Sequence, residues 1–235
     1  MLLDSVPFHI DLPKLLKRLR VPGGDERVAE VEQLAQQAQA IGRPKAVCRV
    51  VFVDEKGEDY VVLGGVKLAS RVLRVNMAQA HRAVAFVATC GTELGQWAAG
   101  IDGMLERYYA DAINELALVA ALHALDAHIT ERINPGPTST MNPGSLTDWP
   151  IDQQRPLFDI LGDVEAAIGV RLTESWLMLP NKSVSGLRFA TEVRFESCQL
   201  CPREGCPGRR AKYDERLYDE RYGLAAPNDP NEGLV

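Results

Sequence analysis

Two stretches decide the fold: MNPGSLTDWPIDQQRPLFDIL (141–161) and LTESWLMLPNKSVSGLRFAT (172–191). In the first, NPGS (142–145) is typical of a turn, because proline fixes its own φ and glycine permits a positive φ. Backbone N–H groups of such a turn can face a cleft. Asp152 is expected to cap a short helix over 153–161. In the second stretch, SVSG (183–186) alternates polar and apolar residues, which predicts a half-buried strand.

Towards the N-terminus, apolar residues recur at helical spacing in two segments. They predict helices over 12–19 and 25–41, which Asp11 and Asp25 are expected to cap. AVCRVVFVD (46–54) and DYVVLGG (59–65) then predict an antiparallel hairpin, because a turn-forming run separates them.

The middle of the chain predicts a short helix that begins at Asn76, a central strand and two longer helices. AVAFVAT (83–89) is apolar throughout, as is typical of a strand covered on both faces. The helical pattern runs over 92–128, with a break at Gly100 and Gly103. After the second stretch we expect one more strand over 187–195 and a loose end over 224–235. This order predicts an α+β fold, a mostly antiparallel sheet with packed helices.

Acidic and basic residues on the second long helix suggest one ion pair and one unpaired carboxylate. Arg107, Asp111 and Glu115 are spaced four residues apart and therefore share a helix face. We expect Arg107 and Asp111 to pair, which leaves Glu115 without a local partner. From the spacing alone, Glu115 is an ordinary solvated glutamate on a helix face.

Composition restricts the kinds of partner. With 46% hydrophobic and 25% charged residues, the chain resembles an ordinary globular protein. A net charge of −6 gives no support for binding nucleic acid or anionic membrane. Neither a secretory signal nor an uncharged run of about 18 apolar residues is evident. Five cysteines, an odd number, fit a reducing compartment, so we expect a cytoplasmic protein.

Three cysteines gather near the C-terminus. Cys198, Cys201 and Cys206 stand among turn-forming residues, which lets several thiolates converge on one metal centre. A structural zinc or an iron–sulfur cluster normally takes four ligands. The fourth is Cys90, Cys48, a histidine, solvent or a partner's residue. Cys90 is preferred because it ends the central strand, and the alternative is three reduced thiols.

Taken together, the two stretches resemble the activation domain of cobalamin-dependent methionine synthase. Matches to the family's turn and Asp-Trp-Pro run, and to its Leu-Thr-Glu-Ser and Ser-Val-Ser-Gly segments, occur in the family's order. The matching residues are Pro143, Gly144, Asp148, Trp149, Pro150 and Gln154, then Leu172, Thr173, Glu174, Ser175, Pro180, Ser183, Val184, Ser185 and Gly186. The resemblance covers about 80–191 and, more loosely, the first 80 residues. It implies an activation-domain-like domain over 1–191, followed by a cysteine-containing tail over 192–235.

The resemblance implies a ligand and a partner. The family binds S-adenosylmethionine and docks on a cobalamin-binding module, whose cobalt is reduced and then methylated. It implies that S-adenosylmethionine binds at Asn142, Pro143, Gly144 and Ser145, with Glu115 as a carboxylate from a helix. The family's arginine and tyrosine at the turn are Thr140 and Ser145 here. By position alone, Arg132, Arg155 and Arg188 are candidate substitutes for the arginine.

Two main hypotheses follow. The first is an accessory protein that reactivates a separate corrinoid methyltransferase by supporting reductive methylation of cobalt with S-adenosylmethionine. The second is a docking or electron-relay module for a corrinoid protein, which uses a cysteine-bound iron–sulfur cluster and no S-adenosylmethionine. An iron–sulfur cluster is preferred over zinc because a redox centre suits a corrinoid activator. A zinc-stabilised protein of unrelated function is a third reading.

Overall fold

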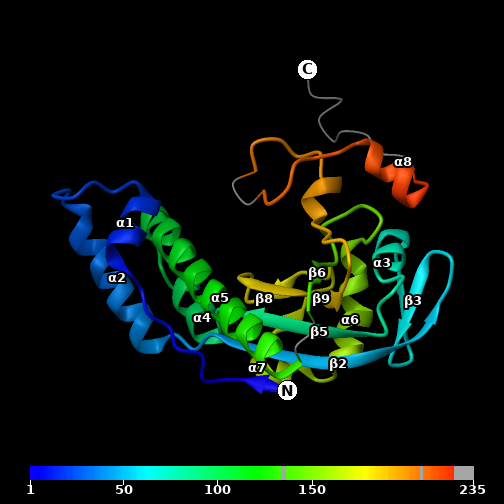
Figure 1. Ribbon diagram of the computed structural model, residues 1–235. Helices are drawn as coiled ribbons and strands as arrows, with labels where there is room; N and C mark the ends of the chain where they lie inside the picture. Colours follow the sequence, from blue (N-terminus) through cyan, green and yellow to red (C-terminus); the bar gives the residue numbers. More distant parts are fainter. Residues whose placement is uncertain (134–135, 207–208, 225–235) are drawn as a thin grey trace. The chain divides into compact units, whose positions relative to one another are not determined.

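The computed structural model describes residues 1–133, 136–206 and 209–224, so the end predicted to be loose lies almost entirely outside the described residues. The expected α+β fold is confirmed (Figure 1). The main sheet has the strand order β4-β3-β2-β5-β9-β6, with β1 beside β2, and a two-stranded sheet joins β7 to β8. The pairs β1–β2, β2–β3, β3–β4, β6–β9 and β7–β8 are antiparallel. The strands are β1 (Leu2–Leu3), β2 (Lys45–Lys56), β3 (Tyr60–Leu63), β4 (Val66–Ala69), β5 (Arg82–Thr89), β6 (Thr138–Met141), β7 (Arg171–Leu172), β8 (Met178–Leu179) and β9 (Ser183–Ala190).

Most predicted helices are present, with changed ends. The break between the two long helices falls between Ala99 and Met104, as expected from Gly100 and Gly103. The helices are α1 (Leu12–Leu19), α2 (Arg27–Ile41), α3 (Arg71–Asn76), α4 (Thr92–Ala99), α5 (Met104–Ile133), η1 (Ile151–Gln153), α6 (Gln154–Leu161), α7 (Val164–Ile168), η2 (Ser197–Leu200) and α8 (Arg216–Tyr222).

The chain divides into two compact units that interleave along the sequence. Unit 1 contains Met1–Cys48, Val87–Asn134 and Asp163–Val184, and unit 2 contains Arg49–Phe86, Pro135–Gly162 and Ser185–Val235. Each unit has its own apolar core. The boundary predicted after Thr191 remains a prediction about how far the family resemblance extends.

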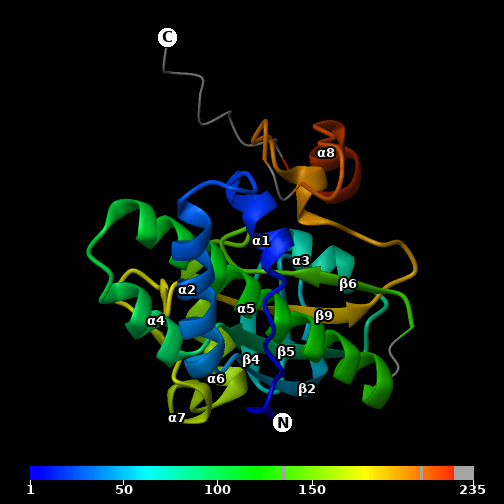
Figure 2. The ribbon, with the colours of Figure 1, turned by 90° about the vertical axis from the view of Figure 1, so that its left-hand side faces the viewer.

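Unit 1 is built on packed helices. The helices α1, α2, α4 and α5 lie side by side, as Figures 1 and 2 show, and bury an apolar cluster that includes Leu15, Val31 and Tyr109. Among the described helices, α5 is long and apolar enough to cross a membrane by length and composition. The core helix of a globular protein passes the same test, and four buried residues of α5 belong to this cluster: Tyr109, Ala112, Ile113 and Ala117.

Of the two helix caps predicted in unit 1, one is confirmed and the other was wrong. Asp11 caps α1 as expected, because its Oδ1 accepts the N–H of Lys14 at 3.1 Å. Asp25 does not cap α2, whose N-cap residue is Glu26. The Asp25 carboxylate instead pairs with the Arg27 side chain, which lowers the pKa of Asp25 to about 2 through hydrogen bonds from Arg27.

In unit 2, the predicted hairpin of β2 and β3 is confirmed. A third strand that was not predicted, β4, pairs with β3 through Tyr60↔Ala69 to Leu63↔Val66. Against these strands pack α3 and α6. The buried cluster of the unit includes Trp149, Phe189 and Tyr222.

The prediction that Asn76 begins a helix was wrong, because Asn76 ends α3. Ser70 is the N-cap, and its Oγ accepts the N–H of Leu73 at 2.9 Å. The Asp148 carboxylate, from a distant part of the chain, also accepts hydrogen bonds at the start of α3. It accepts the N–H of Val72 at 2.9 Å, the N–H of Arg71 at 3.3 Å and the hydroxyl hydrogen of Ser70.

Two further predictions were wrong, one in each of the two stretches. Asp152 lies inside η1 and makes no capping hydrogen bond to α6, whose N-cap residue is Gln153. The two strands expected from residues 183 to 195 are one strand, β9, which ends at Ala190. The chain then folds back, and the N–H of Phe195 donates to Ser139 Oγ at 2.7 Å.

The segment after β9 is part of the core of unit 2. Phe195, Leu200, Tyr218 and Tyr222 are buried there. The Asn76 amide nitrogen donates to the Tyr222 hydroxyl at 3.1 Å, which fastens α8 to α3. The cysteines of this segment therefore lie on a loop that is held at both ends.

We predict that Asp148→Ala lowers the free energy of unfolding by about 2 kcal/mol, because hydrogen bonds to a charged acceptor are lost at the start of α3. The matched control is Asp152→Ala, four residues away, which removes a carboxylate with no capping bond and should change stability by less than about 0.5 kcal/mol. Urea unfolding of both variants measures the difference. Equal stabilities would contradict this role for Asp148.

Candidate functional site

The turn at 142–145 has the predicted form. Gly144 adopts φ +81°, and the N–H of Ser145 donates to Asn142 O at 3.2 Å. A Cβ at Gly144 would also approach Ile151 Cδ1 to 2.7 Å, so both backbone and space favour glycine. The Asn142 amide nitrogen donates to Ser185 O at 2.6 Å and so fastens the turn to β9.

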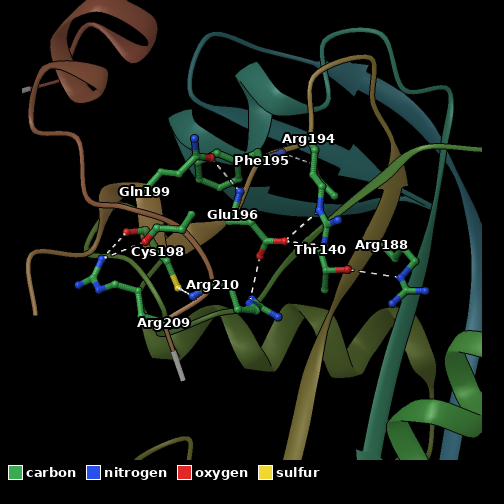
Figure 3. Close-up of polar contacts among 11 residues, drawn as sticks. Thr140, Arg188, Arg194, Phe195, Glu196, Cys198, Gln199, Arg209 and Arg210 are labelled. Atoms are coloured by element: carbon green, nitrogen blue, oxygen red, sulfur yellow. Dashed lines mark hydrogen bonds and ion pairs between the residues drawn. The ribbon is translucent and has the colours of Figure 1, made fainter. Parts of the chain in front are cut away.

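A guanidinium stands beside Thr140, the position of the family's arginine. Arg188 is the cross-strand partner of Thr140 in the pairing of β6 with β9. Its Nε donates to Thr140 Oγ1 at 3.3 Å, and Figure 3 shows the two side chains meeting across the strands. The arginine is therefore missing from the β6 position, but a guanidinium is present on the neighbouring strand.

The other two candidate substitutes lie elsewhere. Arg155 is on α6, where it forms an exposed ion pair with Asp159, with Nε and Oδ1 3.2 Å apart. Arg132 lies in the last turn of α5, in unit 1. Among the three arginines proposed from position, Arg188 is the one that contacts Thr140.

Several residues that carry the family resemblance have structural roles. Trp149 is fully buried in the core of unit 2, and Asp148 holds the start of α3. Gln154 Oε1 accepts the hydroxyl hydrogen of Ser185 at 2.8 Å, which joins α6 to β9. The sequence could not reveal the role of Asp148, because its partners are 76 to 78 residues away.

Glu115 has a partner that the sequence did not suggest. Its Oε2 lies 2.6 Å from Nη2 of Arg18, which belongs to α1, and its side chain is 43% exposed. The predicted pair of Arg107 and Asp111 was wrong. Asp111 Oδ2 lies 2.8 Å from Lys182 Nζ, and Arg107 Nε donates to the carbonyl of Ile101. Glu115 belongs to unit 1 and the turn at 142–145 to unit 2.

One arginine organises the cysteine loop of unit 2. Arg209 Nη1 donates to Cys198 O and Nη2 to Cys201 O, both at 3.0 Å, and the guanidinium also reaches the carbonyls of Arg203 and Ala211. Figure 3 shows Arg209 beside Cys198. Since four carbonyl groups converge on this cation, the loop is held by hydrogen bonds.

The surroundings of Cys198 favour its thiolate form. Partial burial alone would raise the pKa of its thiol, but the backbone N–H groups of Arg210 and Ala211 and the charge of Arg210 outweigh burial. The pKa of Cys198 is therefore lowered. The Arg210 N–H donates to Cys198 Sγ at 3.4 Å.

The predicted metal ligands do not form a ligand set in the described parts of the chain. Across residues 1–133, 136–206 and 209–224, no three His, Cys, Asp or Glu side chains are arranged to hold a metal ion. Cys90 lies in unit 1, apart from the three loop cysteines of unit 2. Burial raises the pKa of Cys90 to about 12, which disfavours the thiolate that a metal needs. This arrangement of side chains gives no support to the metal centre.

Part of the sequence and most of the fold resemble those of known proteins. Residues 146–200 match the family model described as the activation domain of vitamin B12-dependent methionine synthase. No protein with a curated description matches the sequence.

Among solved structures, the MetH reactivation domain bound to S-adenosylhomocysteine (AdoHcy) matches with a TM-score of 0.54 and 14% sequence identity. The match covers 93% of this chain and 79% of that chain, so the likeness is one of fold. The matched 146–200 segment includes Asp148, Gln154 and Arg188. The resemblance expected from the sequence is thereby confirmed: the chain is similar to the activation domain of vitamin B12-dependent methionine synthase, in sequence over residues 146–200 and in fold over most of its length.

Proposed function

We propose that the protein supports reactivation of a separate corrinoid methyltransferase by binding S-adenosylmethionine. The family-model match over residues 146–200 carries the proposal. The fold likeness to a reactivation domain that holds AdoHcy supports it, because AdoHcy remains once S-adenosylmethionine has given up its methyl group. Reductive methylation of the partner's cobalt takes one electron from a separate donor and a methyl group from S-adenosylmethionine. The protein's own contribution is to bind and orient that ligand.

Unit 2 offers groups that suit the amino-acid end of this ligand. A guanidinium matches a carboxylate with two parallel N–H···O bonds, and Arg188 places one beside the turn at 142–145. Gly144, at positive φ, shapes this turn, and the Ile151 side chain fills the space beside its Cα. We propose Arg188 as the replacement for the arginine that the family carries at the position of Thr140.

The reducing conditions of the cytoplasm suit this role. All five cysteines are free thiols in the structure. The proposed partner, a corrinoid-binding protein or methyltransferase, also needs a low-potential electron donor. We therefore propose a cytoplasmic accessory protein and not an enzyme that acts alone.

We predict that Arg188→Gln weakens S-adenosylmethionine binding tenfold to hundredfold, because a charge-assisted bond contributes about 1.5–3 kcal/mol. The matched control, Arg155→Gln, removes an exposed arginine of the same unit and should leave the affinity within about twofold. Calorimetric titration of the protein, purified without oxygen, measures both.

Each outcome of that titration has a separate meaning. No binding of S-adenosylmethionine by the unaltered protein, up to millimolar ligand, would refute the proposed function. Unchanged binding by a folded Arg188→Gln variant would refute the role of Arg188 alone.

The carboxylate of Glu115 can be tested against its own ion-pair partner. If Glu115 binds the ligand, Glu115→Gln should weaken S-adenosylmethionine binding at least tenfold. Arg18→Gln breaks the same ion pair, so any loss due to that pair alone would be common to both variants. Equal effects of the two substitutions in the same titration would assign Glu115 a structural role.

We propose the docking or electron-relay module as a second candidate, on the sequence of the cysteine loop and not on the arrangement of its side chains. Its specific support is the group of three cysteines within residues 198–206, one with a lowered pKa. The family's arginine and tyrosine are replaced by Thr140 and Ser145, which also favours a module that does not use S-adenosylmethionine. A bound iron–sulfur cluster would supply one-electron transfer to the partner's cobalt.

This second candidate predicts stoichiometric iron and acid-labile sulfide in protein purified without oxygen. Both should be lost from the triple variant Cys198→Ser, Cys201→Ser, Cys206→Ser. Cys48→Ala is the control, since Cys48 is buried in β2 of unit 1. Elemental analysis measures the metal content of each protein. Negligible metal in the unaltered protein would refute the second candidate, and so would equal metal content in the unaltered protein and the triple variant.

A further inference from the structure

Unit 1 contains a cavity that neither the turn nor the cysteine loop uses. Its volume is about 780 Å³, within the range of small-molecule sites. It is bordered by α4, by the start of α5 and by the small sheet of β7 and β8. All of its lining residues belong to unit 1.

Small residues keep this cavity open. Gly95, Ala98 and Ala99 present α4 to it with little side-chain volume. A Cβ at Gly95 would meet the Pro180 ring at 2.9 Å, so the helix and the β8 end pack here at their closest approach. Leu179 and Pro180 supply apolar surface on the opposite side.

Two guanidinium groups line the cavity without a carboxylate partner. Within the parts of the chain that the structure describes, neither Arg107 nor Arg171 forms an ion pair. The one acidic lining residue, Asp111, is already matched by Lys182 at 2.8 Å. The lining therefore carries an excess of positive charge, which suits an anion.

Asn114 adds an unsatisfied acceptor to the same lining. Its side chain is 3% exposed, and its amide nitrogen donates to Leu94 O at 3.2 Å. Its Oδ1 accepts no hydrogen bond from any described group. Buried polar atoms are nearly always paired, so an N–H or O–H donor is missing at this point.

We propose that this cavity binds a small organic anion, with a carboxylate or phosphate on Arg107 and Arg171 and a hydrogen-bond donor facing Asn114. The apolar wall accommodates the carbon skeleton of such a ligand. The inference goes beyond the proposed function, because every residue that lines the cavity belongs to unit 1, whereas Arg188 and the turn at 142–145 belong to unit 2.

The test uses citrate as the carboxylate probe and adenosine monophosphate as the phosphate probe. In calorimetric titrations of the full chain, at least one should bind with a dissociation constant of a few millimolar or tighter. Adenosine without the phosphate should bind at least tenfold more weakly than its monophosphate if the phosphate is what the arginines recognise.

Two variants disable the cavity in different ways. Arg107→Gln/Arg171→Gln should weaken probe binding at least tenfold, and Ala98→Phe should do the same by filling the space. The control Arg155→Gln/Arg216→Gln removes the same charge from unit 2, at positions exposed to solvent as Arg107 and Arg171 also are, and should bind within about twofold of the unaltered protein. Circular dichroism confirms that each variant is folded.

Three results would overturn the inference. The first is no binding of either probe up to 20-fold above the expected dissociation constant. The second is equal binding by the unaltered protein and folded cavity variants. The third is loss of S-adenosylmethionine binding in Arg107→Gln/Arg171→Gln, which would make the cavity part of that site. Failure of S-adenosylmethionine to bind the unaltered protein would refute the proposed function and leave this inference standing.

Discussion

The pairing of β6 with β9 is the constraint on which the site in unit 2 depends. Its register places Thr140 opposite Arg188, and each end of the pair is fastened to another segment. At one end, the Asn142 amide holds the turn at 142–145 to Ser185 O. At the other, Ser139 accepts the N–H of Phe195 and returns the chain towards the cysteine loop. A slip by one residue would turn these side chains to opposite faces and separate the guanidinium from the turn.

This register brings the Arg188 guanidinium of β9 beside Thr140, which occupies the position of the family's arginine on β6. A positive charge is therefore present at this position of the sheet even though the sequence motif lacks its arginine. A residue directly across an antiparallel pair lies about as close as a neighbour on the same strand, so a guanidinium on either strand can serve one ligand. A sequence motif that covers β6 alone contains Thr140 and gives no sign of the arginine on β9. If Arg188 serves the ligand as proposed, the departures from the family pattern at Thr140 do not remove carboxylate binding.

Local patterns predicted most elements but not their distant partners. The apolar run of β5, the β2–β3 hairpin, the break before α5 and the Gly144 turn all follow from neighbouring residues, and all are confirmed. Asn76 was placed at the wrong end of α3 because the helix start is set by Ser70 together with Asp148, far away in sequence. The partners of Asp111 and Glu115 were missed for the same reason, since Lys182 and Arg18 come from other elements. The cavity beside Asn114 needs three separate segments, and no sequence pattern marks it.

The most direct test of the account is a crystal structure of the protein with AdoHcy bound. The account predicts the ligand's carboxylate within hydrogen-bond distance of the Arg188 guanidinium and its body against the turn at 142–145. A complex in which the carboxylate is held by another residue, with Arg188 still bonded only to protein groups, would contradict the central claim that Arg188 replaces the family's arginine.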